Sequence, residues 1–134
     1  MKFNGKVILH VDDDPDDREL LREAMETIAP DVNLTFAVDG LKALEALKLA
    51  QETETLPCLI VLDLNMPYLN GIQTFERIKA DIYLSAIPVV VLSSGENPAD
   101  KLLFSQAGVD YFNKPIEYSG FKVIASHLAN LYCR

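Results

Sequence analysis

Carboxylate side chains gather at the ends of two apolar stretches of the chain. An aspartate triplet, residues 12–14, follows the apolar run 7–11, and Asp63 follows the apolar run 59–62. The carboxyl ends of parallel strands meet at one edge of an α/β sheet, where ligands bind. Clustered carboxylates repel one another unless one is protonated or a cation offsets their charge. The sequence therefore predicts a metal site built around a reactive aspartate.

Further polar residues follow the other apolar runs. In strand order, the candidate side chains of the site are Asp12, Asp13, Asp63, Asn65, Ser93 and Lys114. Oxygen ligands alone favour a hard cation such as Mg²⁺. An aspartate can attack phosphorus to give an aspartyl phosphate. Phosphoryl transfer needs little beyond positioning and charge neutralisation, which a metal, an ammonium and a hydroxyl would supply.

The elements that must position these residues alternate along the chain. Apolar runs of strand length are separated by segments with helical spacing, which predicts repeated βα units and a mostly parallel sheet. The expected strands are 6–11, 34–38, 59–63, 89–92 and 110–113. Five such units, (βα)5, fit a flavodoxin-like, doubly wound α/β fold with strand order 2-1-3-4-5 and helices on both faces. The first and third strands would then be neighbours.

Each helix should bury one apolar stripe. In the first helix Asp14 suits the N-cap and Pro15 the first helical position, while Gly108 should end the fourth helix. The last helix is expected over 120–132, with Ser119 as its N-cap. The side chains expected to face the core are, helix by helix, Leu20, Leu21, Ala24, Met25 and Ile28; Leu41, Leu44 and Leu47, with Leu49 a further candidate; Ile72, Phe75 and Ile78; and Leu102, Leu103 and Ala107.

The composition excludes several classes of protein. The chain has 134 residues and a formal net charge of −8, which argues against binding nucleic acid or an anionic membrane surface. No apolar run is long enough to span a membrane, and the start lacks the apolar core of a signal peptide. Cys58 and Cys133 fit no zinc or redox spacing and suit a reducing compartment. We expect one cytoplasmic domain over residues 1–134, with no output domain.

Four motifs together resemble the receiver domain of bacterial two-component response regulators, over essentially the whole chain. Each motif is weak alone, but their order and their positions at strand ends are specific. They are the acidic run 12–15, the segment 63–67 with Gly71, the pair Ser93 and Ser94, and the segment 111–115.

The resemblance implies a role for each acidic residue and its neighbours. Asp63 matches the phosphoacceptor of the family. Asp13 matches a direct ligand of Mg²⁺ (or Mn²⁺), and Asp12 an acidic neighbour that acts through water. Asn65 matches the residue whose backbone carbonyl completes the metal shell.

The resemblance also implies a switch. Ser93 matches the hydroxyl that moves toward the phosphoryl group, and Lys114 the cation that pairs with it. Pro115 follows, often after a cis bond, and Tyr111 matches the aromatic residue that turns inward. The implied protein is a signalling phosphoacceptor rather than an enzyme. It would receive its phosphoryl group from a histidine kinase or a phosphotransfer protein and act on a downstream target through the fourth helix, fifth strand and fifth helix, a face through which receivers also form homodimers.

Three other functions fit parts of the sequence. A phosphohydrolase resembling the haloacid dehalogenase superfamily would need an aspartate where this chain has Asn65. A flavodoxin-like FMN binder would need a Ser/Thr/Gly-rich phosphate loop where this chain has the aspartate triplet and Pro15, which would repel phosphate without a metal. A degenerate receiver that only binds partners would not need the matched site residues, all of which are present.

Several of these residues also have ordinary structural explanations. Asp14, Asp16 and Asp17 suit the first turn of a helix, where the dipole favours negative charge, and we expect them there rather than at the metal. His10 is expected as a packed side chain within the first strand, and not as a phosphohistidine. Tyr111, taken without the resemblance, suits the edge of the core.

Overall fold

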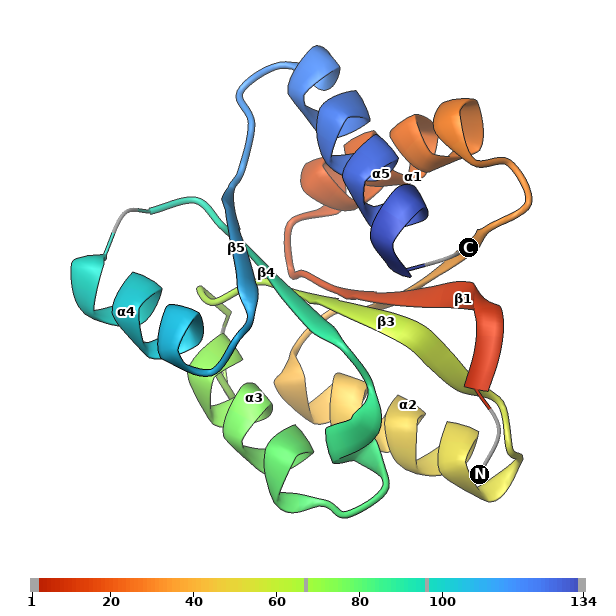
Figure 1. The fold of residues 1–134 in the computed structure, drawn as a ribbon, viewed down its shortest axis with the longest axis vertical. Helices are drawn as coiled ribbons and strands as arrows, with labels where there is room; N and C mark the ends of the chain where they lie inside the picture. Colours follow the sequence, from red (N-terminus) through yellow and green to blue (C-terminus); the bar gives the residue numbers. More distant parts are fainter. Residues whose placement is uncertain (1–2, 67, 96, 133–134) are drawn as a thin grey trace.

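The computed structural model describes residues 3–66, 68–95 and 97–132. Strands and helices alternate through this part of the chain, as predicted. In chain order they are β1 (Phe3–Val11), α1 (Pro15–Ile28), β2 (Asn33–Ala37), α2 (Gly40–Glu52), β3 (Leu56–Leu62), α3 (Gly71–Ala80), the short 3-10 helix η1 (Leu84–Ala86), β4 (Val89–Ser93), α4 (Pro98–Gln106), β5 (Asp110–Asn113) and α5 (Tyr118–Tyr132). One sheet lies between a layer of α1 and α5 and a layer of α2, α3 and α4 (Figure 1). Among the described residues, no helix has the length and apolarity needed to cross a bilayer.

The sheet has the predicted topology. Its strands run in the order β2-β1-β3-β4-β5, and all neighbouring pairs are parallel. Every residue of β4, and all but one of β3, is buried, as expected for central strands that helices cover on both faces. The register pairs Val11 with Leu62, so β1 and β3 end at the same level. The residues that follow them, Asp12 and Asp63, are therefore neighbours.

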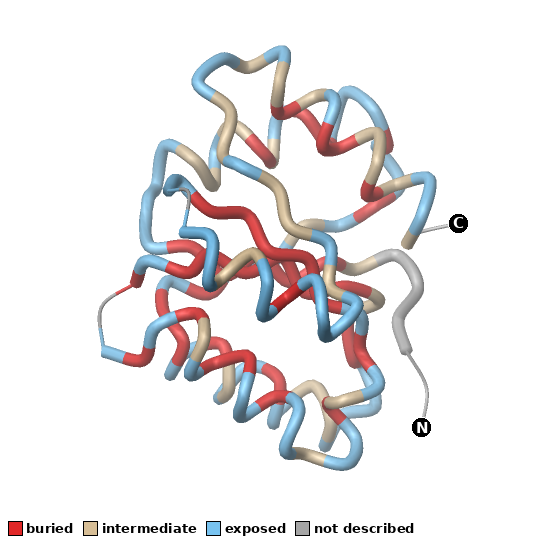
Figure 2. Tube along the Cα trace, turned by 60° about the vertical axis from the view of Figure 1, so that its left-hand side comes forward, coloured by how far each residue is buried: buried red, intermediate tan, exposed pale blue. Residues whose placement is uncertain are grey.

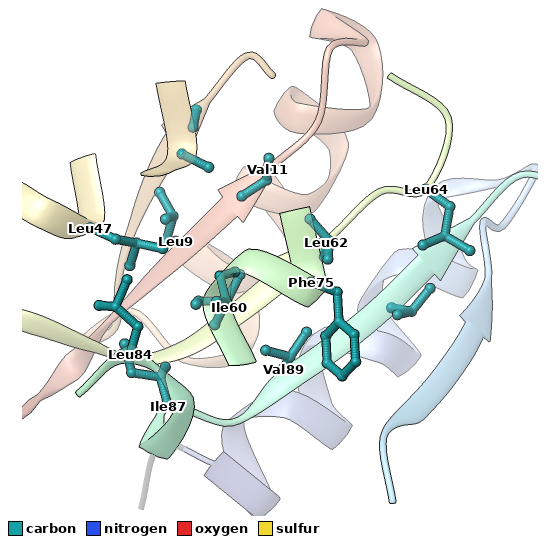
Figure 3. Packing of buried hydrophobic residues seen from close by; sticks show 14 of the residues in the cluster. Leu9, Val11, Leu47, Ile60, Leu62, Leu64, Phe75, Leu84, Ile87 and Val89 are labelled. Atoms are coloured by element: carbon teal, nitrogen blue, oxygen red, sulfur yellow. The ribbon is translucent and has the colours of Figure 1, made fainter. Parts of the chain in front are cut away.

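The core has two halves, one on each face of the sheet. Because successive strand residues point to opposite faces, Leu9 and Val11 pack toward α2, α3 and α4, whereas Ile8 packs toward α1 and α5. Figure 3 shows the first half, in which Leu47 of α2 and Phe75 of α3 meet the strand residues. Burial is concentrated along the central strands and the inner faces of the helices (Figure 2). Covering both faces this way holds the strand ends rigidly.

The predicted buried face of α2 is partly confirmed, because Leu47 is buried and Leu44 packs against the core. Leu41 and Leu49 are 46% and 61% exposed, whereas Gly40, Ala43 and Leu47 are buried. A Cβ at residue 40 would lie 2.1 Å from Thr74 Oγ1. The helix therefore turns its small residues toward α3, where the two helices approach closely, and apolarity alone misidentifies part of this face.

The predicted buried face of α4 is wrong. Leu102 and Leu103 are 58% and 44% exposed, and Ala107 is the exposed C-cap. Instead Phe104 is completely buried, with its ring centroid 5.0 Å from that of Phe75 in an edge-to-face arrangement. One aromatic side chain thus anchors this nine-residue helix, which leaves its leucines outside.

Element ends differ from the predictions by a few residues. Asp14 caps α1 by accepting a hydrogen bond from the Asp16 N–H, and Pro15 is its first residue, both as predicted. In contrast, Ser119 lies inside α5, which begins one residue earlier, and Ile28 at the end of α1 is 41% exposed. The second helix ends at Glu52, with Thr53 as its C-cap. Gly108 ends α4 with a φ of +73°, as expected for a left-handed C-terminal residue.

Candidate phosphoryl and metal site

Three carboxylates meet at the carboxyl edge of β1 and β3. Asp12, Asp13 and Asp63 each place an oxygen within 4.8 Å of those of the other two. Asp12 and Asp63 are buried, whereas Asp13 is exposed. The Asp63 N–H donates to the Val11 carbonyl at 2.9 Å, so the ladder between the strands fixes this spacing. The oxygen donors and their mutual repulsion suit a divalent cation.

An ammonium group faces this cluster from the end of β5. Lys114 Nζ lies 3.0 Å from Asp12 Oδ2, 3.4 Å from Asp63 Oδ2 and 2.8 Å from Asp17 Oδ2, and its side chain is 9% exposed. The Lys114 N–H donates to the Ser93 carbonyl at 2.7 Å, which ties the end of β5 to β4. Burial would lower the pKa of Lys114, but its three carboxylate partners outweigh this and raise it above its ordinary value. The lysine is therefore charged.

The two buried carboxylates have opposite pKa shifts. Burial raises the pKa of Asp63 to about 7, and the charge of Asp12 adds to this increase, while Lys114 opposes it. Burial acts on Asp12 in the same sense, but His10, the backbone N–H of Asp14 and Lys114 together lower its pKa below the ordinary value. Without a cation, Asp12 is thus the ionised member of the pair, and Asp63 holds a proton up to near-neutral pH.

Ser93 and Tyr111 both contact the backbone of Gly95. The Ser93 hydroxyl is buried and lies 3.4 Å from the Gly95 N–H, and the half-buried Tyr111 donates its phenol O–H to the Gly95 carbonyl at 3.2 Å. The Tyr111 ring centroid lies 6.3 Å from that of Phe104. The predicted switch residues therefore share one contact point in the loop between β4 and α4.

The loop after β3 turns its backbone toward the acidic cluster. The Asn65 N–H donates to Asp63 Oδ1 at 3.2 Å, and the Asn65 side chain donates to the Ser94 hydroxyl at 3.4 Å. Asn65 thus lies beside Asp63. Pro67 of the same motif lies outside the described residues. No cis peptide bond occurs in the described part of the chain, so the cis form implied for Pro115 is not present.

Sequence reasoning missed three residues that support the site. Asp17 and Arg18 come from the first turn of α1. Asp17 contacts Lys114, and Arg18 Nη1 donates to the Asp12 carbonyl at 2.9 Å. His10 is packed inside β1, as predicted, but its Nε2 lies 3.4 Å from Asp12 Oδ2, and neither ring nitrogen has a hydrogen-bond partner among the described residues. Asp17 was expected only as a first-turn charge, because nothing local shows which residue faces it.

Sheet order, acidic cluster and buried lysine together define a receiver-type α/β protein. Residues 8–124 match the sequence model of the response regulator receiver domain, and the chain belongs to this family of two-component signalling proteins. It is 40% identical over 97 residues to response regulator Rcp1 of Synechocystis sp., a match that covers 71% of this chain and 66% of Rcp1. It is 35% identical to two-component response regulator ARR17 of Arabidopsis thaliana, covering 95% of this chain and 86% of ARR17.

Solved structures of receivers superpose closely on this fold. The phosphorylated cyanobacterial phytochrome response regulator RcpA has a TM-score of 0.85 and 30% sequence identity, and the match covers 95% of this chain and 93% of RcpA. The Mn²⁺-bound form of Rcp1 has a TM-score of 0.81 at 30% identity, covering 96% and 95% of the two chains. The predicted family and fold class are both confirmed.

Proposed function

We propose that this protein accepts a phosphoryl group on Asp63 from the phosphohistidine of a histidine kinase or phosphotransfer protein. The observation that carries the proposal is the position of Asp63, whose carboxylate lies at the strand edge beside those of Asp12 and Asp13 and 3.4 Å from the Lys114 ammonium. A carboxylate oxygen of Asp63 attacks phosphorus as the bond from phosphorus to the imidazole nitrogen breaks. The electron pair of that bond returns to the nitrogen, and the ring leaves as neutral imidazole when its other nitrogen carries a proton.

The acidic cluster fits a hard divalent cation. In the proposed site Asp13, Asp63 and the Asn65 carbonyl would hold Mg²⁺ (or Mn²⁺), and Asp12 would act through water. When bound, the cation neutralises the phosphoryl oxygens. Lys114 supplies the second positive charge from the protein itself, and Ser93 supplies a hydroxyl donor.

The readout is proposed to pass through Gly95. A phosphoryl group on Asp63 would draw the Ser93 hydroxyl toward it and release the backbone that Tyr111 now holds. The face formed by α4, β5 and α5 would then change its contacts. Leu103 on this face is 44% exposed and Val123 is 70% exposed, which suits binding of a downstream target protein or a second copy of the chain.

We further propose that the protein is a signalling phosphoacceptor rather than an enzyme with a separate substrate, that residues 1–134 act as one receiver domain, and that it works in the cytoplasm, as its cysteine usage suggests. Its affinity is for proteins, because its net charge of −8 disfavours nucleic acid and anionic lipid.

Intact-mass spectrometry after incubation with acetyl phosphate and Mg²⁺ tests the phosphoacceptor. The expected result is a gain of one phosphoryl mass that disappears with EDTA and in Asp63→Asn. Asp16→Asn, which removes an exposed carboxylate at the neighbouring helix start, is the control and should be labelled like the wild type. Equal labelling of Asp63→Asn would show that another residue is the acceptor.

A further inference from the structure

The Lys114 ammonium lies among three carboxylates and donates a hydrogen bond to one of them, Asp17. An ammonium group has three N–H donors and accepts no hydrogen bonds. The oxygens around Lys114 Nζ belong to Asp17 at 2.8 Å, Asp12 at 3.0 Å and Asp63 at 3.4 Å. The shortest contact is therefore to Asp17, a residue of the neighbouring helix, and the longest is to the acceptor itself.

The contact to Asp17 is protected from solvent. The side chains of Lys114 and Asp17 are only 9% and 18% exposed, and charge-assisted hydrogen bonds in such surroundings are stronger than those on an open surface. Asp17 is also the strongest of the influences that raise the pKa of Lys114. The ion pair with Asp17 therefore holds the ammonium toward α1 more strongly than a solvent-exposed ion pair would.

A phosphoryl group on Asp63 would need a donor from the same ammonium. Its oxygens lie beyond the present carboxylate of Asp63, so Lys114 must re-aim at least one N–H toward them. Since the ammonium now donates to Asp17 at 2.8 Å and lies close to Asp12 and Asp63, this movement weakens its contact to one of these carboxylates. Asp12 is completely buried and would be left as an uncompensated charge, whereas the more accessible Asp17 can recover its interactions with water.

We infer that Asp17 is a positioning residue that competes with the phosphoryl group on Asp63 for Lys114, and so weakens the phosphoryl-bound state. The inference rests on the proposed function of Asp63 and adds to it a residue that sets the balance between free and phosphorylated forms. Asp17 touches neither phosphorus nor the metal ligands in this arrangement, and acts through Lys114.

The test compares the affinity of matched variants for beryllofluoride, a stable phosphoryl mimic, at saturating Mg²⁺. Bound beryllofluoride is followed by ¹⁹F NMR, and Mg²⁺ affinity is measured separately by calorimetry. Asp17→Asn is expected to bind beryllofluoride roughly three- to tenfold more tightly than the wild type, because one competing charge-assisted hydrogen bond is lost. Asp16→Asn removes the same charge one residue earlier from an exposed position, and should keep the wild-type affinity.

The direction of the change separates competition from damage, since a disturbed site would bind beryllofluoride more weakly. Asp17→Glu restores the carboxylate and should return the affinity toward that of the wild type. An Asp17→Asn variant that binds no more tightly than Asp16→Asn would overturn the inference while leaving the proposed function intact. A wild-type protein that binds no beryllofluoride at saturating Mg²⁺ would instead contradict the proposed function itself.

Discussion

The carboxylates of Asp12 and Asp63 lie side by side in a buried position, and the same ammonium group contacts both, at 3.0 and 3.4 Å. One positive charge therefore faces two buried acids, with Asp13 and Asp17 close by. Burial penalises the ionised form of such a pair. The stability of the folded protein should therefore depend on pH and on bound cations.

In the absence of divalent metal, Asp63→Asn should stabilise the protein at neutral and alkaline pH. The pKa of Asp63 rises from 3.8 to about 7 on folding, chiefly through burial. The stability that this shift supplies is complete below about pH 4 and is lost as pH rises through about 7. Asparagine stays neutral, so the gain over the wild type should grow across that interval to about 2–4 kcal/mol. Urea denaturation in EDTA at about pH 4 and about pH 8 measures it.

At saturating Mg²⁺ the wild type should instead be more stable than Asp63→Asn. An ion that binds only the folded state stabilises it, and Asp63→Asn lacks one of the carboxylates proposed to hold Mg²⁺. Asp16→Asn is the control for the loss of a carboxylate at the surface. If the wild type and Asp63→Asn had parallel pH profiles in EDTA, the burial effect on Asp63 would be refuted.

Lys114→Ala should leave Mg²⁺ binding largely intact but abolish most of the conformational response. The ammonium contacts carboxylates and repels the metal, so its loss does not remove a metal ligand. Without it, a phosphoryl group on Asp63 lacks the cation that links it to β5. Backbone NMR shifts of β5 and α5 on adding beryllofluoride measure the response, with the exposed Lys48→Ala as the charge-matched control. Normal shifts in Lys114→Ala would mean that this lysine has no part in switching.

Phe104→Ala should destabilise the fold by about 3–5 kcal/mol, the usual cost of emptying a buried aromatic site. Phe104 is completely buried against Phe75, while Leu102, two residues away, is 58% exposed. Leu102→Ala should therefore change the free energy of unfolding by less than about 0.5 kcal/mol. Chemical denaturation of both variants decides whether α4 is anchored by its phenylalanine or by its leucines, and equal losses would contradict the structure.

Tyr132→Phe should weaken the attachment of the end of α5 to β5. The Tyr132 O–H donates to Asp110 Oδ2 at 2.6 Å, and such a bond contributes about 0.5–1.5 kcal/mol. Burial, together with Asp110, raises the pKa of Tyr132 to about 12. The contribution should thus be constant below about pH 10 and be lost as pH rises toward 12.

Hydrogen exchange of the α5 amides at near-neutral pH measures this attachment. Tyr68→Phe removes a phenol that is 82% exposed and serves as the control. Unchanged exchange in Tyr132→Phe would show that the bond does not hold the helix end.

Local patterns in the sequence were sufficient to predict most of the sheet and the acidic site. Apolar runs such as 59–62 identify buried strands, and the topology of parallel βα units places their carboxyl ends along one edge. Asp12, Asp63 and Ser93 directly follow or end such runs, Asp13 comes one residue later, and Lys114 follows the short strand β5. These side chains therefore come together only with a suitable strand order and register. Few other arrangements of the strands would bring them together.

Helix faces were harder to predict, because apolarity does not measure how closely two helices approach. In α2 the residue against α3 is Gly40, since any side chain there would collide with Thr74, and two leucines are left outside. In α4 a single aromatic side chain fills the space beside Phe75. Both outcomes depend on the shape of the neighbouring surface. The spacing of apolar residues along a helix carries no information about that shape.

The sequence by itself thus determined the fold class, the strand order and the acidic edge, because these follow from short-range apolar patterns and the topology of parallel strands. Only the tertiary structure decided which carboxylate holds the lysine. Asp17 and Lys114 are 97 residues apart, and they meet because α1 packs beside α5 with its first turn over the ends of β1 and β5. Contacts of this kind arise from the rigid placement of whole elements and leave no local signal in the chain.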